Sequence, residues 1–230
     1  MPLQLYIGNK NYSSWSMRPW VLLKQTGIPF EERMIRFDSF DADSKFKAEL
    51  GRLSPVGKVP VLVDDGLAIW DSLAIAEYVA EKFPEKKLWP TDVKLRARAR
   101  SVCAEMHSGF SGLRNHFGMN IEASLADVGK RVLAEQPQVQ ADLARIVQMW
   151  SELLAEHKGP MLFGDFTVAD AFFAPVVKRI LTYGLPVPPV IAAYIDRVQA
   201  LPSVTAWTKD ALAEKDFLAF EEDYRQPPSR

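Results

Sequence analysis

The β-prone runs of this 230-residue chain all lie within its first 70 residues, and this asymmetry limits the possible folds more than any other feature. The runs are LQLYI (3–7), FEERMIRF (30–37), VPVLV (59–63) and LAIW (67–70), and the DDG between the last two is typical of a hairpin turn. Later in the chain there is hardly any strand signal. A small sheet followed by an all-helical region is therefore expected.

Helical patterns separate these β-prone runs. WSMRPWVLLKQ (15–25) has apolar residues at helical spacing, and we expect this helix to begin close to Ser16, because Pro19 is tolerated best near a helix start. The segments at 41–50 and 72–83 are also predicted to be helical. The predicted order is βαβαββα, which fits a sheet covered by helices with a right-handed crossover between the first two, parallel, strands.

The character of the sequence changes at PEKKLWPTD (84–92), where two prolines and clustered charges are typical of a linker between domains. We therefore predict an α/β domain over residues 1–83, a linker over 84–92 and an all-helical domain over 93–230.

Within the second domain, residues 93–118 and 137–157 read as long amphipathic helices. The second of them carries apolar residues that step by four and three, as a buried stripe requires: Val139, Leu143, Ile146, Trp150 and Leu153. Thr167 and Asp170 form a capping-box pattern before an apolar run, which predicts a helix start at Thr167.

Composition excludes several classes of function. The chain has 28 Lys and Arg against 29 Asp and Glu, and this balance provides no field to attract nucleic acid or an anionic membrane. No run reaches the ~18 apolar residues of a membrane span, and the amino terminus does not read as a signal peptide, so we expect a soluble, cytoplasmic protein. The single cysteine, Cys103, cannot form an internal disulfide. The histidines lack metal-ligand spacing, so no metal is expected; they are His107, His116 and His157.

Three loops of the first domain carry polar residues that could bind a ligand or take part in a reaction. The first is Ser13-Ser14, before the first helix. A serine at this place is most often only an N-cap, but two exceed what one cap needs. A hydroxyl can also donate to a thiolate held at the helix start; lowering a thiol pKa from about 8.5 to near 6.5 requires ~2.7 kcal/mol.

The second loop is Lys58-Val59-Pro60, and the third is Asp71-Ser72. Pro60 fits an ordinary edge strand, but a cis Val59–Pro60 bond would turn the Val59 backbone toward a bound peptide. Asp71-Ser72 is by default a helix cap, yet it could also bind the ammonium and carboxylate of an amino-acid head group. The three loops together indicate a short anionic peptide that contains a thiol.

Several segments resemble the cytosolic glutathione transferases. YSSWSMRPWVLLKQTGIPFE, SPVGKVPVLVDDG and LAIWDSLAIAEYVAEKFP are similar to the amino-terminal domain of that family, and FGDFTVADAFF is similar to the capped helix of its carboxyl-terminal domain. The resemblance covers nearly the whole chain and is closest to serine-type classes, zeta-like and uncharacterised bacterial members. It implies a thioredoxin-like domain before an all-helical domain, a homodimer, a role in detoxification, and reduced glutathione as co-substrate for attack on a small hydrophobic electrophile or a peroxide.

The resemblance also implies roles for individual residues. Ser13 falls on the family's activating serine, and Ser14 is the alternative because the loop leaves room for a slip of one residue. The positions that correspond to glutathione-binding residues are Lys58 near the glycyl carboxylate, Val59 before Pro60 at the cysteinyl backbone, and Asp71 with Ser72 at the γ-glutamyl end.

The pocket for the second substrate is expected between the domains. Met106, Phe110 and Arg114 lie four apart on one predicted helical stripe and are candidates for its wall. Such a stripe also fits a helix that packs in the core. His107 and His116 are further candidates near this pocket, although a surface position suits isolated helical histidines equally.

Two alternatives to a transferase stay open. The first keeps glutathione but changes the reaction to isomerisation or disulfide reduction; zeta-class isomerases carry a cysteine where this chain has Trp15, and Cys103 lies outside that loop. The second is a non-catalytic interaction protein, like the stringent-starvation regulators that bind RNA polymerase. Tyr12 is a possible hydroxyl donor, as in tyrosine-type classes, but it matches their position poorly.

Overall fold

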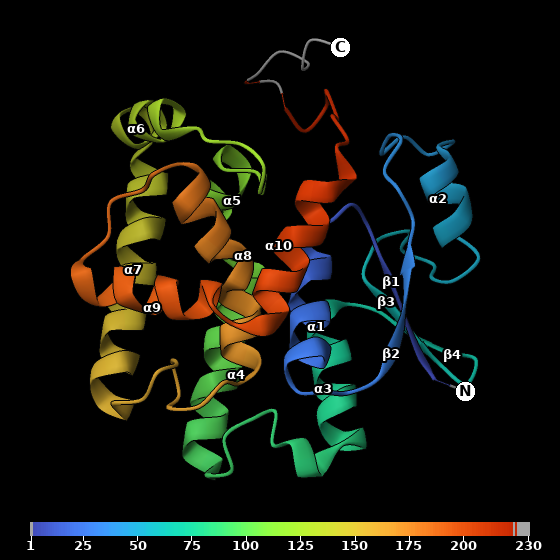
Figure 1. The fold of residues 1–230 in the computed structure, drawn as a ribbon, viewed down its shortest axis with the longest axis horizontal. Coiled ribbons are helices and arrows are strands. Elements are labelled where there is room, and N and C mark those ends of the chain that lie inside the picture. The colour runs from blue at the N-terminus through green and yellow to red at the C-terminus, as the bar shows by residue number, and fades with distance from the viewer. Residues whose placement is uncertain (1, 223, 225–230) are drawn as a thin grey trace.

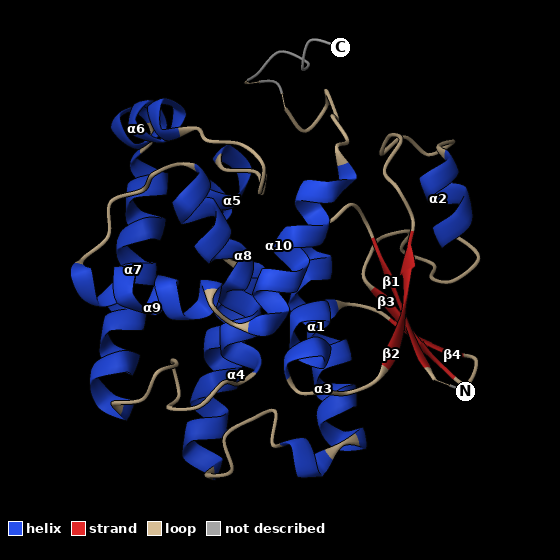
Figure 2. Ribbon diagram, viewed as in Figure 1, coloured by secondary structure: helices blue, strands red, loops and turns tan. Residues whose placement is uncertain are grey.

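The computed structural model describes residues 2–222 and 224. In the first part of the chain, a four-stranded sheet has the order β2-β1-β3-β4, with β1 parallel to β2 and the other neighbours antiparallel. The strands are β1 (Leu3–Ile7), β2 (Phe30–Met34), β3 (Val61–Asp64) and β4 (Leu67–Ile69). The predicted strand sites and the hairpin are confirmed (Figure 2).

Three helices cover this sheet, in the predicted order βαβαββα: α1 (Ser14–Gln25), α2 (Lys45–Leu50) and α3 (Ser72–Lys82). α1 and α3 lie on the face that looks toward the rest of the molecule, and α2 lies on the opposite side (Figure 1). This is the thioredoxin-like domain that the sequence predicted.

α1 begins at Ser14, two residues earlier than predicted, so that Pro19 lies in its second turn. The proline removes only one intrahelical hydrogen bond, the one that its N–H would have donated to the Trp15 carbonyl. The early start brings the loop serines directly onto the helix, with Ser13 as the N-cap residue.

β2 is shorter than the predicted run, because it is an edge strand with a single partner. Its last paired residue, Met34, lies opposite Ile7, the last residue of β1. One more backbone hydrogen bond follows, from the Ile35 N–H to the Ile7 carbonyl at 2.8 Å. Beyond it, β1 has ended and offers β2 no further residue to pair with. Phe37 is thereby released into a loop.

The second part of the chain is helical, as predicted. Beyond Ile69 no strand occurs in the described residues, where only isolated bridges form between residues 161 and 165. A short 3-10 turn, η1 (Pro84–Lys86), precedes α4 (Val93–Ser108), α5 (Ser111–His116), α6 (Ala126–Glu135), α7 (Pro137–His157), α8 (Val168–Thr182), α9 (Pro189–Gln199) and α10 (Pro202–Glu214).

The predicted helix over 93–118 is two helices, and this prediction was wrong. α4 ends at Ser108, and Phe110 adopts a left-handed conformation with φ 55°. At Gly109 an added Cβ would lie 2.7 Å from the Glu105 carbonyl oxygen, so the turn needs a glycine there. Met106, Phe110 and Arg114 therefore do not form one continuous helical stripe.

Two other helical predictions are confirmed. All five residues of the α7 stripe are buried. At the start of α8, the Asp170 carboxylate accepts from the Thr167 N–H at 2.9 Å, and Thr167 Oγ1 accepts from the Ala169 N–H at 3.3 Å. The capping box thus fixes Thr167 as the N-cap of α8.

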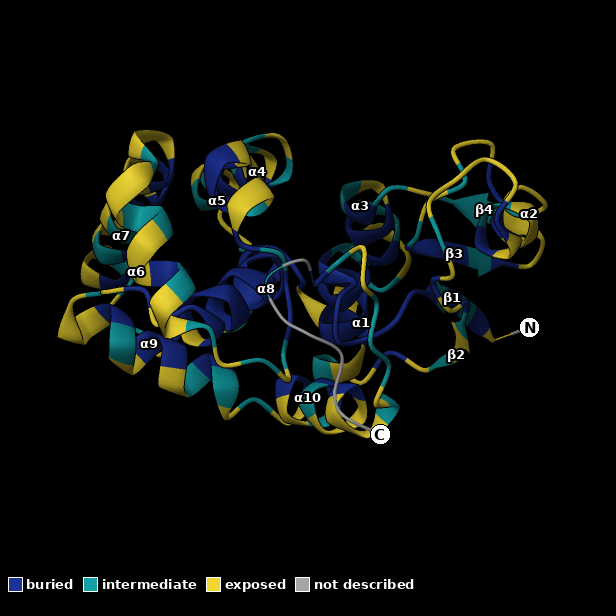
Figure 3. Ribbon diagram, turned by 90° about the horizontal axis from the view of Figure 1, so that it is seen from above, coloured by how far each residue is buried: buried dark blue, intermediate teal, exposed yellow. Residues whose placement is uncertain are grey.

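One continuous apolar core joins the two parts of the molecule. It extends from β1 through α1 to α8 and α7, and nearly every residue of α8 is buried (Figure 3). α1 packs against the sheet on one side and against α8 and α10 on the other. The loop before α1 therefore lies where both parts can contribute side chains to a site.

Candidate active site

Two adjoining clefts lie beside the start of α1. The first cleft, of about 400 Å³, is lined by all five residues predicted to bind the tripeptide: Lys58, Val59, Pro60, Asp71 and Ser72. The second cleft, of about 420 Å³, is lined by Ser13 and Ser14. The clefts share Trp15, Lys58, Val59 and Arg114 as common walls. Three loops that are distant in sequence thus meet at one place.

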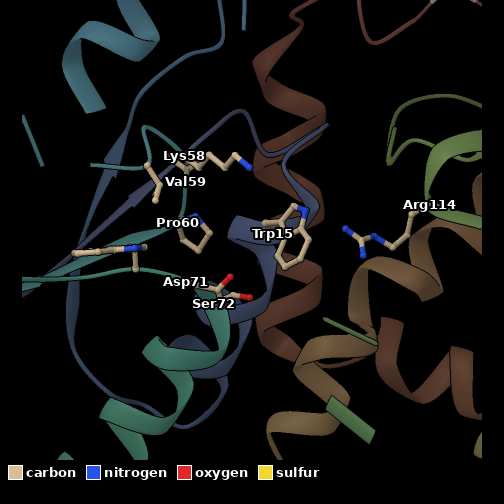
Figure 4. A pocket seen from close by; sticks show the side chains of 9 residues that line it. Trp15, Lys58, Val59, Pro60, Asp71, Ser72 and Arg114 are labelled. Carbon is tan, nitrogen blue, oxygen red and sulfur yellow. The ribbon is translucent and has the colours of Figure 1, made fainter. Parts of the chain in front are cut away.

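The arrangement around the first cleft is visible in Figure 4. Trp15 projects from α1 between the loop of Lys58 and Val59 on one side and Arg114 of α5 on the other. Asp71 and Ser72 lie at the start of α3.

The two serines have different hydrogen-bond partners. Ser13 Oγ donates to Ser16 Oγ at 2.7 Å, and Ser13 does not cap α1 through its side chain. Ser14 Oγ accepts from Arg179 Nη2 at 3.1 Å. A hydroxyl that accepts from a guanidinium keeps its own proton free to donate, so Ser14 is arranged to donate to an anion in the second cleft.

The loop before β3 presents Val59 to both clefts. The Val59–Pro60 peptide bond is cis, the isomer considered above for turning the Val59 backbone toward a bound peptide. Lys47 of α2 donates through Nζ to the Gly57 carbonyl at 2.8 Å and ties this loop to α2. Lys58 is exposed at the rim, where its ammonium is free to meet a carboxylate.

Asp71 is a helix cap and also a cleft residue. Its Oδ1 accepts from the Leu73 N–H at 2.8 Å at the start of α3, while Oδ2 lies 3.3 Å from His107 Nε2. Burial lowers the pKa of His107 below its ordinary value, so the ring is neutral at neutral pH. Ser72 is buried and accepts from Arg18 Nη1 at 3.5 Å.

Three arginines surround the start of α1: Arg18, Arg114 and Arg179. None of them forms an ion pair within the described part of the chain. Burial, together with Arg114 and Arg179, lowers the pKa of Arg18 to about 9; burial and Arg114 lower that of Arg179 to about 10. Both remain cationic at neutral pH. The clefts are therefore electropositive and favour anions.

Trp15 links these charges. The Arg18 guanidinium lies 4.1 Å from the centre of the Trp15 ring, and that of Arg114 lies 4.7 Å from it. Contacts of this kind hold guanidinium groups in place through the ring's quadrupole. Trp15 thus orders two cations beside the clefts that it lines.

Comparison with known proteins identifies the family. The model of the glutathione S-transferase N-terminal domain matches residues 12–82, and that of the glutathione S-transferase C-terminal domain matches residues 120–210. The chain belongs to the glutathione S-transferase family. All the residues predicted for the tripeptide lie within the first match.

Similar proteins agree with this glutathione S-transferase assignment. Glutathione S-transferase 1 of Dianthus caryophyllus is 32% identical over 80% of each chain. A probable maleylacetoacetate isomerase of Caenorhabditis elegans is 31% identical over 80% of this chain and 82% of its own. The crystal structure of a glutathione transferase homolog from Burkholderia, with bound glutathione, superposes with a TM-score of 0.70 at 28% identity, over 93% of this chain and 100% of that one.

Of the three residues predicted to line the pocket for the second substrate, only Arg114 lies at these clefts. Met106 and Phe110 are buried in the core, and neither is among the described residues that line the two clefts. The break at residues 109–110 turns α5 away from the line of α4, so only Arg114 of the three faces the clefts. His107 lies beside Asp71 instead, and His116 Nδ1 lies 3.0 Å from the Gly112 carbonyl oxygen.

Sequence reasoning missed a large part of the second cleft's wall, including Phe37, Phe40, Phe46, Met119, Arg179 and Glu221. One signal was present, because three phenylalanines within ten residues follow β2 in a stretch that is otherwise polar. Arg179 stands beside Lys178 in the otherwise largely apolar run AFFAPVVKRILT of α8, where buried cations are unusual. Nothing in the sequence places Glu221 near Ser13 and Ser14.

Three further features bear on this glutathione S-transferase: the Cys103 thiol, groups that could hold a metal ion, and helices that could cross a membrane. Cys103 is buried on α4, and burial raises the pKa of its thiol well above the ordinary value. In the described residues, no group of three or more His, Cys, Asp or Glu side chains is placed to hold a metal ion. None of the helices described is long and apolar enough to cross a membrane.

Proposed function

We propose that this chain binds reduced glutathione in the first cleft and joins its sulfur to a small electrophile in the second, so that the whole glutathionyl group becomes attached to that electrophile. The observation that carries the proposal is the meeting of three loops: Lys58 to Pro60 and Asp71 with Ser72 line one cleft, and Ser13 with Ser14 line the adjoining one. A tripeptide spanning the first cleft would have its central thiol near the shared wall.

The charges of the first cleft fit the two ends of glutathione. Asp71 would hold the γ-glutamyl ammonium through Oδ2, since Oδ1 is occupied by the cap. The Ser72 hydroxyl and the N–H groups at the start of α3 would hold the γ-glutamyl carboxylate. Lys58 would meet the glycyl carboxylate, and the Val59 backbone would pair with the cysteinyl residue.

Activation of the sulfur would occur at the start of α1. The thiol loses its proton to solvent, and a serine hydroxyl donates to the thiolate, with the helix end and the nearby arginines adding to its stabilisation. The family resemblance favours Ser13; the contacts favour Ser14, because its hydroxyl accepts from Arg179 and keeps its proton free. The thiolate then forms the sulfur–carbon bond, and the leaving group departs with the electron pair.

The experiment has two parts. Calorimetric titration with glutathione tests binding, and turnover of chlorodinitrobenzene, which releases chloride and forms the glutathione conjugate, tests the transferase reaction. Absence of heat with glutathione at millimolar concentration, in a protein that is folded by circular dichroism, would sink the proposal.

Isomerisation is a second candidate, because a probable maleylacetoacetate isomerase is among the similar proteins. Trp15 speaks against it, because the zeta-class isomerases that the chain resembles carry a cysteine at this loop position, and here the Trp15 ring contacts Arg18 and Arg114 instead. If isomerisation of a cis-enedione were as fast as transfer to chlorodinitrobenzene, this second candidate would replace the first.

Further parts of the proposal concern the protein's setting. We infer a homodimer, a cytoplasmic location, a role in detoxification and a domain boundary within 84–92. Support for association comes from exposed large apolar side chains on the first part of the chain and on α4, among them Leu67, Trp70 and Val93. Light scattering of the purified protein tests the association, with the mass of one chain as the contradicting result.

A further inference from the structure

The second cleft has an aromatic wall. Phe37 and Phe40 come from the loop after β2, and Phe46 comes from α2. Their ring centres lie 4.9 to 6.1 Å apart in edge-to-face geometry. A group of three rings in edge-to-face contact is a suitable surface for a flat aromatic ligand.

The opposite side of the cleft is cationic. Arg179 is buried, and its orientation is fixed by donation from Nε to the Phe117 carbonyl at 2.7 Å and from Nη2 to Ser14 Oγ. Arg114 donates to the carbonyls of His107 and Gly109, both at 3.2 Å. These partners are neutral, so the two positive charges are oriented but not balanced.

The charge that faces Arg179 is the chain's own Glu221. It lies in the segment after α10 and lines the same cleft, and its carboxylate makes no hydrogen bond or ion pair with another described residue. Burial raises the pKa of Glu221, and Arg179 opposes that rise. Its side chain is only partly buried. The two groups thus attract each other across the cleft without closing it.

The segment that carries Glu221 is attached to the first part of the molecule. The Tyr12 hydroxyl donates to the Asp216 carbonyl at 2.9 Å, Arg36 pairs with the Asp216 carboxylate, and Phe220 packs on Phe40 with ring centres 5.1 Å apart. Glu221 is therefore held over the cleft by its neighbours and not by Arg179.

We propose that the second cleft selects electrophiles that carry an anionic group on an aromatic ring, with Arg114 and Arg179 as partners of the anion and Glu221 as a competing carboxylate. This inference rests on the proposed function and names its substrate class. The ring would lie on the phenylalanine wall and its carboxylate would face the arginines. Glu221 lowers the affinity for such ligands and discriminates against those with weak anionic character.

The test compares two ligands that differ by one carboxylate, 3,5-dinitrobenzoate and 1,3-dinitrobenzene, whose meta nitro groups do not activate one another for displacement by a thiolate. Their dissociation constants are measured by calorimetry on the full chain, with and without saturating S-methylglutathione. Charge-assisted hydrogen bonds to an arginine predict that dinitrobenzoate binds about tenfold more tightly or better. Equal affinities would overturn the inference.

Variants assign the effect to residues. Arg114→Gln should weaken dinitrobenzoate about tenfold and leave dinitrobenzene unchanged, and Arg114→Lys should retain part of the preference. Glu221→Gln should strengthen dinitrobenzoate several-fold, because a like charge is removed. Glu49→Gln, an exposed change on α2 outside both clefts, is the matched control and should change neither affinity. A Glu221→Gln protein with unchanged dinitrobenzoate affinity would contradict the role given to Glu221.

Failure of this inference differs from failure of the proposed function. A wild-type protein that turns over chlorodinitrobenzene but binds both ligands equally would sink the anion preference alone. One that prefers dinitrobenzoate but neither binds glutathione nor turns over chlorodinitrobenzene would sink the transferase, and with it the reading of this cleft as an acceptor site.

Discussion

Arg179 Nη2 donates to Ser14 Oγ at 3.1 Å, and this hydrogen bond joins residues 165 positions apart. The guanidinium comes from the buried helix α8, and the hydroxyl stands in the first turn of α1. A structural helix of the second part of the chain thereby reaches the residues that would activate the sulfur. The bond orients the Ser14 hydroxyl and brings a positive charge beside it.

This relationship predicts that Ser14→Ala affects the glutathione thiol more than Ser13→Ala does. Loss of a charge-assisted donor should raise the pKa of the bound thiol by about one unit and lower kcat/KM with chlorodinitrobenzene about tenfold or more. Titration of the thiolate absorbance measures the first, and steady-state kinetics the second. Ser108→Ala, on the exposed end of α4, is the control. A larger effect in Ser13→Ala would assign the role to Ser13.

Two substitutions of Asp71 distinguish its role as a helix cap from its proposed role in binding glutathione. Asparagine caps helices as well as aspartate does, so Asp71→Asn should keep the melting temperature while weakening glutathione several-fold through loss of charge. Asp71→Ala should lose about 1 kcal/mol of stability as well, because the Leu73 N–H loses its acceptor. Calorimetry and thermal unfolding report the two effects. An unchanged affinity of Asp71→Asn for glutathione would mean that Asp71 acts only as the N-cap of α3.

Lys178 on α8 predicts a pH dependence of stability. Burial lowers its pKa to about 8, and its ammonium donates to the neutral partners Gln199 and Thr208. Between pH 8 and the unfolded value of about 10.4, the unfolded chain binds more protons, so stability rises with pH in this window. The gain is on the order of 2–3 kcal/mol.

The comparison is with Lys178→Met, which removes the titrating group and fills a similar volume. The difference in unfolding free energy between wild type and Lys178→Met, from urea titrations at several pH values, should shift in favour of the wild type as pH rises through this window. A constant difference would contradict the depressed pKa.

Met106 is expected to act in folding and not in substrate binding. It is fully buried in the core, so Met106→Ala should cost about 2–4 kcal/mol in unfolding free energy. The KM for chlorodinitrobenzene should be unchanged at a temperature where the variant stays folded. A raised KM without loss of stability would instead support the sequence-based prediction that Met106 lines the pocket for the second substrate.

The sequence was sufficient wherever the signal is local. The strand runs before residue 70, the α7 stripe and the Thr167–Asp170 box each depend on residues within a few positions of one another, and the structure confirms them. The same reason explains why the loops of Ser13, Val59 and Asp71 were recognisable. Each lies at the end of a helix or strand, where polar and turn-forming residues can be recognised in the amino-acid sequence.

Local sequence patterns do not reveal how these loops meet or which side chains face them. The α4 break depends on Gly109 and a left-handed Phe110, which a helical period does not record. Arg179 and Glu221 reach the serines because α8 packs on α1 and because the last segment crosses back over the cleft. Propensity and capping act over about four residues, whereas the composition of a pocket is set by packing between distant elements. For that reason the three polar loops were predictable and the wall of the second cleft was not.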